Sequence, residues 1–255
     1  MKIKWYGTAG VSFETESSAI IFDPYIPCRG SETPSAEEEF QRFKDIIITH
    51  GHFDHVSTLP KTVKKSGAKV WCTKTPYVNL SCMGIPDENL RKFAPGDVME
   101  FGDIKVTPFR SLHVKYDKKL LRSVVFSFRV IRYFGNLVKL AADSLDCTMG
   151  DEIVGFLIEA EGKRIYLMGS LGWLEDVDYP RDVDLLVLPY QGTTDLLTPA
   201  LKFIEMTNPK AVFLDHFDNT FPPLSSHIDT SDIESALEDK LPLTVPVFNE
   251  TYEIY

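Results

Sequence analysis

The sequence predicts an α/β fold in which helices cover a partly parallel β-sheet. Apolar runs at 45–48 and 183–189 have the composition of strands buried on both faces. A helical pattern at 57–66 follows the first run and a short strand at 69–72 comes next, which is the order of a βαβ unit. The 255 residues, 44% of them apolar, suffice for one large α/β domain or two ordinary ones. Because no repeat or linker divides the chain, we expect a single domain over 1–255.

The first part of the chain predicts an antiparallel meander and then a short helix at 36–43. The strands of the meander are separated by turn residues and occupy 2–6, 11–15 and 19–23. Asp23 directly follows the third strand and precedes a proline. Two interpretations fit this position: Asp23 begins a turn, or its carboxylate hydrogen-bonds a metal-binding histidine.

The sequence Thr-His-Gly-His-Phe-Asp-His follows the 45–48 strand and holds three of the six histidines of the chain. His50, His52 and Asp54 are two residues apart, so in extended backbone they face the same side, and His55 points elsewhere. Imidazole and carboxylate groups are good zinc ligands. The cluster therefore predicts a metal site at the end of a buried strand. The alternative is a loop with surface histidines.

The middle of the chain predicts a helix beginning at Thr75 or Pro76 and two further strands at 98–101 and 104–110. His113 follows the second of these strands. A single histidine at such a position is usually structural. Beside the upstream histidine cluster, it becomes a candidate third ligand for the first metal.

Residues 117–150 interrupt the pattern with a basic, aromatic-rich insert in an acidic protein. We expect helix from about 120 to 142, bent at Gly135. The insert either packs on the domain or on a second subunit, which would make a homo-oligomer, or it serves as a lid or a lipid-binding segment.

After the insert, a hairpin pairs 153–160 with 164–168, and Ser170 follows it. The strand at 183–189 leads into a polar loop that begins with Tyr190, which we expect to face a pocket. The remaining elements are a helix at 195–207, a strand at 211–214, a helix at 231–237 with a capping box of Ser231 and Glu234, and a last strand at 245–254. His216 comes just after the 211–214 strand, whereas His227 is expected at the surface or the pocket rim.

Composition restricts the function and the location. The net charge of −10 and the pI near 5.1 argue against a nucleic-acid-binding protein. The four cysteines have no close spacing, which is typical of reduced thiols. The N-terminus lacks a signal-peptide core, and no apolar run approaches the ~18 residues of a membrane span. We expect a cytoplasmic protein without a transmembrane segment.

The histidine cluster THGHFDH resembles the signature of the metallo-β-lactamase superfamily, whose members are mostly zinc-dependent hydrolases. The resemblance implies an αββα sandwich, with two mixed sheets flanked by helices. It covers most of the chain, because the family pattern continues with a distant histidine, an acid and a last histidine. The stretches Trp5–Gly10 and Ile21–Pro24 resemble the opening of the branch that contains ascorbate-6-phosphate lactonase.

The resemblance implies two metal ions with three protein ligands each. The first ion would be held by His50, His52 and His113, and the second by Asp54, His55 and His216. Two ions ~3.5–4 Å apart can share a hydroxide that attacks the substrate. Asp54 would then be catalytic, orienting that hydroxide and receiving its proton. Zinc is the expected metal, with manganese or iron as alternatives.

Ser170 departs from the family pattern, which has a metal-bridging aspartate at the matching position. A hydroxyl is a poor metal ligand at neutral pH. We expect two ions with the second bound more weakly, and a single zinc ion is the alternative.

The function that follows is hydrolysis of an ester, lactone, amide or phosphodiester bond in a small-molecule substrate. Two other classes stay open. One is an iron-dependent dioxygenase acting on persulfides, which has a related histidine set. The other is a binding protein with a degenerate site.

Overall fold

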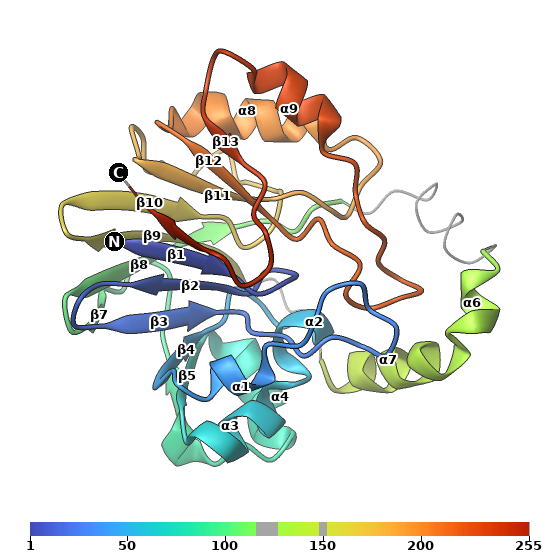
Figure 1. The fold of residues 1–255 in the computed structure, drawn as a ribbon. Helices are drawn as coiled ribbons and strands as arrows, with labels where there is room; N and C mark the ends of the chain where they lie inside the picture. Colours follow the sequence, from blue (N-terminus) through green and yellow to red (C-terminus); the bar gives the residue numbers. More distant parts are fainter. Residues whose placement is uncertain (116–126, 148–151, 255) are drawn as a thin grey trace.

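The computed structural model describes residues 1–115, 127–147 and 152–254. Two β-sheets lie face to face, and helices cover both outer faces (Figure 1). In the described residues each sheet has seven strands, in the orders β14-β1-β2-β3-β4-β5-β6 and β13-β12-β11-β10-β9-β8-β7. The expected αββα sandwich is therefore confirmed.

The strands of the first sheet are β1 (Lys2–Trp5), β2 (Val11–Glu14), β3 (Ala19–Phe22), β4 (Asp45–Ile47), β5 (Lys69–Cys72), β6 (Leu90–Lys92) and β14 (Thr251–Glu253). Those of the second sheet are β7 (Met99–Phe101), β8 (Ile104–Ser111), β9 (Ile153–Ala160), β10 (Lys163–Leu167), β11 (Leu185–Pro189), β12 (Val212–Asp215) and β13 (Leu243–Thr244). The helices are α1 (Glu37–Phe40), α2 (Phe53–Val56), α3 (Leu59–Ser66), α4 (Lys74–Cys82), α6 (Arg129–Arg132), α7 (Phe134–Asp146), α8 (Leu197–Thr207) and α9 (Ser231–Leu237), with a 3₁₀ turn η1 at Asp87–Asn89.

Both sheets are mixed. In the first, β1, β2 and β3 form the expected antiparallel meander, and β3 to β6 run parallel. In the second, β7 to β10 are antiparallel, and β10 to β13 are parallel. Parallel strands end at the same edge of their sheet, where ligand sites of layered α/β folds collect.

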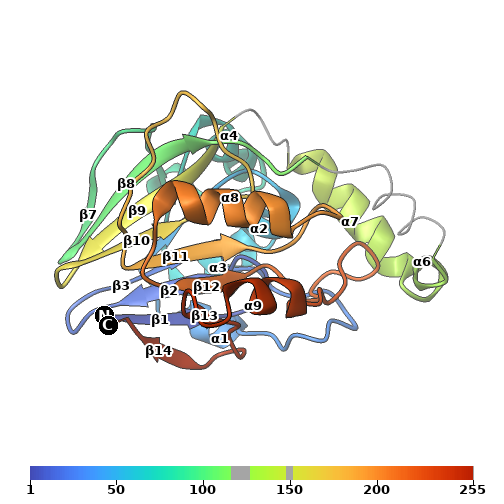
Figure 2. The ribbon, with the colours of Figure 1, turned by 90° about the horizontal axis from the view of Figure 1, so that it is seen from above.

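The main core lies between the sheets, where Phe22 of β3 meets Phe156 of β9 with 5.1 Å between ring centroids. Strand β4 is apolar after Asp45 because its isoleucines pack on both faces of the sheet. Ile47 faces this core, whereas Ile46 packs into a second cluster under α1, α3 and α4. Helices α8 and α9 cover the second sheet beside β11 and β12 (Figure 2). Phe203 of α8 reaches the main core from that side.

Several expected elements need correction. Helix α2 and strand β6 were not predicted, because both are very short. Of the strand expected at 245–254, only β14 at Thr251–Glu253 forms, and β13 ends before the expected start. Pro246 has no N–H for a ladder and the chain turns at Asn249 (φ 63°), so residues 245–250 are not strand and cross from the second sheet to the first. The capping box of Ser231 is wrong. Thr230 is the cap residue of α9, and its Oγ1 donates to Glu234 Oε1 over 2.5 Å.

The described part of the insert contains two helices, α6 and α7, which extend beyond the end of the sandwich (Figure 1). The break between them falls at Tyr133, two residues before the expected bend at Gly135. The start of the helix expected at 120 lies outside the described residues. Leu140 of α7 is buried against Phe221, and Asn136 Nδ2 donates to the carbonyls of Arg29 and Pro222 over 2.8 Å each. The described part of the insert thus packs on the body of the molecule through α7.

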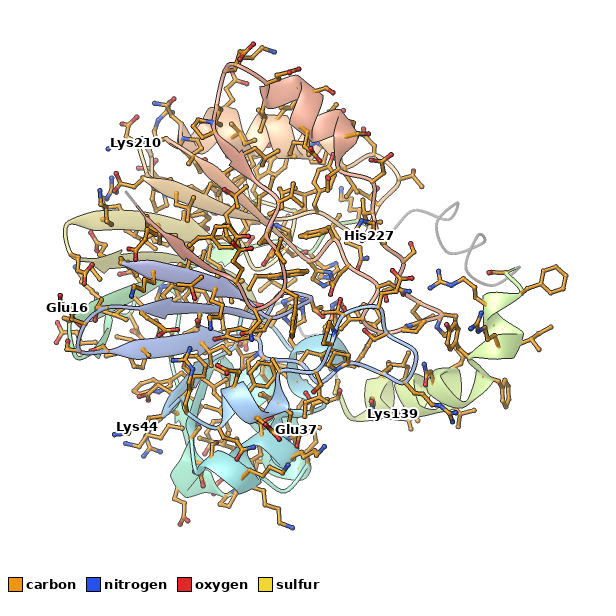
Figure 3. The ribbon with its side chains drawn as sticks, in the orientation of Figure 1. Glu16, Glu37, Lys44, Lys139, Lys210 and His227 are labelled. Carbon is orange, nitrogen blue, oxygen red and sulfur yellow. The ribbon has the colours of Figure 1, made fainter. Side chains whose placement is uncertain are left out.

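None of the helices in the described segments is long and apolar enough to cross a membrane. His227 is exposed at the surface, on the loop that precedes α9 (Figure 3). All four cysteines are free thiols, and Cys28, Cys72 and Cys147 are buried.

Candidate metal centre

Six candidate ligands come from three segments, each of which follows a strand, and Asp54 and His55 lie in α2 within the first segment. His50, His52, Asp54 and His55 follow β4, His113 follows β8, and His216 follows β12. Strand β4 belongs to the first sheet, whereas β8 and β12 belong to the second. The candidate centre therefore lies at one end of the sandwich, where loops from both sheets meet.

The first group contains the imidazoles of His50, His52 and His113, whose nearest nitrogen atoms lie within 4.8 Å of one another. His50 Nε2 and His52 Nδ1 are 3.1 Å apart. Two nitrogens bound tetrahedrally to one zinc at ~2.0–2.1 Å would be ~3.3 Å apart, so this pair fits a shared ion. The His113 ring centroid is 4.4 Å from that of His52.

Hydrogen bonds to the outer ring nitrogens set the tautomers of this group. His113 Nδ1 is 2.7 Å from the carbonyl of Val114, which can only accept, so this nitrogen donates and the lone pair is on Nε2. His50 Nδ1 is 2.9 Å from Thr49 Oγ1, which itself donates to Asp23 Oδ2 over 2.6 Å. His50 Nδ1 must then donate as well. Both rings direct a lone pair inward, as metal coordination requires.

The second group contains Asp54, His55 and His216, again within 4.8 Å. His216 Nε2 lies 3.1 Å from Asp54 Oδ2, and His55 Nε2 lies 3.8 Å from the same oxygen. Two buried polar atoms beside this group, His216 Nδ1 and Asp215 Oδ1, have no hydrogen-bond partner in the described part of the chain. A carboxylate, two imidazoles and unsatisfied polar atoms fit a bound cation.

Asp54 belongs to the second group and does not face the side that its two-residue spacing from His52 predicted. In extended backbone it would face the same side as His50 and His52. Helix α2, however, begins at Phe53, directly after His52, whose backbone is still extended at φ −65° and ψ 151°. The helical turn rotates Asp54 away from the first group and places it beside His55.

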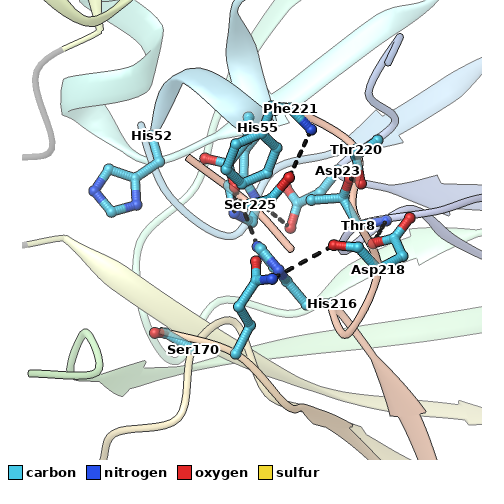
Figure 4. Close-up of polar contacts among 12 residues, drawn as sticks. Thr8, Asp23, His52, His55, Ser170, His216, Asp218, Thr220, Phe221 and Ser225 are labelled. Carbon is cyan, nitrogen blue, oxygen red and sulfur yellow. Dashed lines mark hydrogen bonds and ion pairs between the residues drawn. The ribbon is translucent and has the colours of Figure 1, made fainter. Parts of the chain in front are cut away.

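Asp23 connects the two groups. It is fully buried, and its Oδ2 accepts from His55 Nδ1 over 2.9 Å (Figure 4). The same carboxylate accepts from the backbone N–H and the hydroxyl of Thr49, whose hydroxyl in turn accepts from His50. Asp23 therefore orients one histidine of each group, which agrees with the interpretation of its carboxylate as a partner of metal-binding histidines.

Burial keeps the first group neutral. It lowers the pKa of His50 well below the usual range, and the imidazoles of His55 and His52 lower that pKa further. Burial also lowers the pKa of His52 to about 4. The pKa of His113 is lowered for the same reason. Neutral imidazoles are the form that binds metals.

The second group is charged. Burial alone would raise the pKa of Asp54, but His55 and the hydrogen bond from His216 hold that pKa below its usual value. Burial disfavours the protonated form of His55, yet the carboxylates of Asp23 and Asp54 raise its pKa to about 9. The pKa of His216 is also raised, because its bond to Asp54 outweighs burial. Burial raises the pKa of the neighbouring Asp215 to about 7.

Three of the eight described non-glycine residues with positive φ lie at or near the candidate centre. Thr8, Asp23 and His216 have φ values of 50°, 43° and 56°, a region that non-glycine residues seldom adopt. The N–H of His216 donates to the carbonyl of Thr8 over 2.8 Å, which ties two of these residues together. Strained backbone of this kind is frequent at functional sites.

Ser170 lies in the cavity wall, and its hydroxyl accepts from the N–H of Val114 over 3.0 Å. It therefore helps to fix the loop that carries His113. Tyr190 lies elsewhere, which corrects the expectation that it faces the pocket. Its ring is buried in the main core, and its hydroxyl donates to Asp232 Oδ1 over 2.8 Å. The chain turns after Pro189, so Gln191 lines the cavity instead.

All six candidate ligands line one cavity of about 470 Å³, within the range of small-molecule sites. The polar loop after β11 was expected to face a pocket, and its residues Gln191 and Thr193 line this cavity. The sequence did not predict the lining residues that come from α2, the insert and the loop after β12, which include Phe53, Arg129, Phe221 and Ser225. Only the basic character of the insert hinted at Arg129. The others carry no local signal.

Comparison with known proteins shows the family to which this chain belongs. Residues 18–217 match the model of the β-lactamase superfamily domain. A UPF0173 metal-dependent hydrolase of Ligilactobacillus salivarius is 27% identical over 240 residues, which is 90% of each chain. A UPF0173 metal-dependent hydrolase of Geobacillus thermodenitrificans is 28% identical over 232 residues, or 88% of each chain.

Solved structures agree in fold. Igni18, a metallo hydrolase from the archaeon Ignicoccus hospitalis, superimposes with a TM-score of 0.66 at 20% identity, over 100% of this chain and 99% of that one. An isothiocyanate hydrolase from Delia radicum gut bacteria gives a TM-score of 0.63 at 14% identity, over 99% and 98% of the two chains. With the family model matched over residues 18–217, this chain belongs to the β-lactamase superfamily.

Proposed function

We propose that this protein is a metal-dependent hydrolase that cleaves an ester, lactone or phosphodiester bond of a small molecule. The observation that carries the proposal is the pair of three-donor groups lining one cavity. The curated relatives named above, which match 88–90% of this chain, bear the name metal-dependent hydrolase. The resemblance of the N-terminal stretches to the lactonase branch favours esters and lactones among the candidate bonds.

The candidate ligands have different proposed roles. His50, His52 and His113 would hold one ion, and Asp54, His55 and His216 would hold another, with zinc as the proposed metal because imidazole and carboxylate suit it. Bound ions would lower the pKa of a coordinated water and polarise the bond under attack.

Asp54 is the only carboxylate among the described residues that line the cavity. It is therefore the group available to orient the attacking water and to accept its proton. Asp23 keeps the imidazoles of His55 and His50 in the tautomers that metal binding needs.

Metal analysis combined with turnover tests the proposal. Metal-stripped protein would be reloaded with zinc, manganese or iron, and its metal content measured by mass spectrometry. Each form would then be assayed with 4-nitrophenyl acetate, γ-thiobutyrolactone and bis(4-nitrophenyl) phosphate. We expect at least one zinc per chain and metal-dependent hydrolysis of one of these bonds. Iron retention with O₂ uptake on glutathione persulfide, and no hydrolysis, would favour the oxygenase class instead.

A further inference from the structure

The described part of the cavity wall contains one fixed cation in addition to the candidate metal ligands. Among the described lining residues Arg129 is the only lysine or arginine, and it comes from α6 of the insert. Its Nη2 donates to Asn219 Oδ1 over 3.0 Å and to the carbonyl of Ser225 over 2.7 Å. Ser225 also lines the cavity, so Arg129 is anchored to the cavity wall.

The charge of Arg129 is not neutralised by a carboxylate in the described part of the chain. Both of its bonds go to uncharged oxygens and use Nη2. A guanidinium has five N–H donors, and none of the described contacts uses Nε or Nη1, so these atoms offer donors to a ligand. The nearest acid in this network is Glu32, which accepts from the amide of Asn219 and not from Arg129. A half-buried cation with no counterion among the described residues favours an anionic ligand.

Arg129 also lies close to the metal-ligand loops. Ser225, its partner, accepts through Oγ from the N–H of Phe221 over 2.8 Å (Figure 4). The ring of Phe221 is 6.3 Å from the ring of His216. One loop thus connects the cation to the second ligand group. A ligand that fills the cavity can reach both.

The rest of the wall is largely apolar. Its described apolar side chains include Phe53, Val114, Leu171, Phe221, Leu224 and Ile228. An apolar wall with one fixed charge selects a ligand with an apolar body and one charged group. The planar fork of a guanidinium matches the two oxygens of a carboxylate or a phosphate.

We propose that Arg129 is a specificity-determining residue that binds an anionic group of the substrate, a carboxylate or a phosphate, while the bond to be cleaved lies at the histidine groups. This inference rests on the proposed hydrolytic function. It narrows the substrate class to amphiphilic small molecules that carry a negative charge away from the reacting bond.

Binding experiments test the inference without requiring turnover. Titration calorimetry on zinc-loaded protein would compare three probes: 4-phenylbutyrate, phenyl phosphate and the neutral 4-phenylbutyramide. We expect at least one anion to bind about tenfold to a hundredfold more tightly than the amide, the range of a charge-assisted hydrogen bond. The tighter of the two anions identifies the preferred group.

Substitutions in α6 of the insert test whether Arg129 causes the preference for an anion over the amide. Arg129→Gln should abolish the difference between anion and amide, and Arg129→Lys should keep part of it. Arg132→Gln is the matched control, because Arg132 lies in the same helix, is exposed and lies outside the cavity wall. It should bind all three probes as the unmodified protein does.

Two outcomes would overturn the inference. If Arg129→Gln weakens anion and amide binding equally, Arg129 only anchors the insert. If His52→Ala abolishes the anion preference and Arg129→Gln does not, the anion binds at the metal site. A preference that depends on Arg129, found in a protein that hydrolyses no ester, lactone or phosphodiester, would support the anion site while the hydrolytic function fails.

Discussion

The two ligand groups of the candidate metal centre are chemically similar but differ in electrostatics. His50, His52 and His113 form a group of three imidazoles whose pKa values burial lowers. The other group places the carboxylate of Asp54 between two imidazoles, and there the pKa of His55 is raised to about 9. The first group offers neutral donors, whereas the second carries charges of both signs.

The difference shows two ways of preparing a cation site. In the first, withdrawal from water and mutual repulsion keep the rings deprotonated, so no acid is needed. In the second, the neighbouring acids attract positive charge, and they raise the pKa values of both His55 and His216. Asp23 interacts with both ligand groups. It contacts His55 of the second group directly and reaches His50 of the first group through the hydroxyl of Thr49. The comparison therefore predicts that the groups respond differently to changes in nearby charge.

The largest expected effect is that of Asp54→Asn. It removes the only carboxylate in the described cavity wall and with it the proposed proton acceptor, so kcat should fall ~10²–10⁴-fold. Zinc content should fall at the second group alone. His52→Ala should remove zinc from the first group instead, as measured by metal analysis of both variants. Full metal content and activity in Asp54→Asn would end the distinction between the groups.

Asp23→Asn should have the next largest effect. Loss of the carboxylate removes the partner of His55 and disturbs the bond of Thr49 that orients His50, so metal affinity or activity should fall ~10–100-fold. Chelator competition should show the greater loss at the second group, which Asp23 contacts directly.

Asp218→Asn is the matched control for this substitution. Asp218 is also buried, but it accepts from Thr8 and Thr33 and has no contact with a histidine among the described interactions. The Asp218→Asn substitution should reduce the thermal midpoint of unfolding while leaving zinc affinity unchanged. Equal metal loss in Asp23→Asn and Asp218→Asn would mean that metal affinity depends on any buried carboxylate in this region and not on the contact of Asp23 with the histidines.

Ser170→Asp should have a smaller effect, of opposite sign. The added carboxylate faces the cavity, and a second acid should tighten the weaker metal about tenfold, or ~1.4 kcal/mol. Titration of zinc-loaded protein with a chelator would measure it, and Ser170→Asn controls for side-chain size. A wild-type protein that never binds more than one equivalent under zinc excess would contradict the two-ion arrangement.

The smallest effect concerns pH in the metal-free protein. The pKa of His55 is raised above that of an unfolded histidine, so its contribution to stability is complete below pH ~6.5 and is lost as pH rises through about 9. The pKa values of the first group are lowered, so these histidines reduce stability as pH falls below ~6.5. Histidine NMR titration should find His55 protonated at pH 8 and His50 neutral at pH 6. The reverse order would refute the electrostatic difference.

Much of this arrangement could be predicted from the sequence because the signals are local. The apolar run of β4 predicted a buried strand, and the histidines after it predicted the candidate metal site at the strand end. His113 and His216 were also predicted as candidate ligands because each follows a strand. The family pattern was needed to assign each of them to one of the two ligand groups. Asp23 was found by its position after a strand, although only the folded chain separates a partner of His55 from a turn residue.

Tertiary structure decided what no local pattern contains. Helix α2 is a single turn, too short for a periodic signal, yet it moves Asp54 from one ligand group to the other. Tyr190 was expected in the pocket because it begins a polar loop. In the structure its ring packs in the main core and its hydroxyl donates to Asp232 of α9. The contact of Arg129 with Asn219 and Ser225 joins residues about ninety positions apart. Sequence periodicity determines which face of an element is buried, whereas the contacts between distant loops depend on how the two sheets pack together.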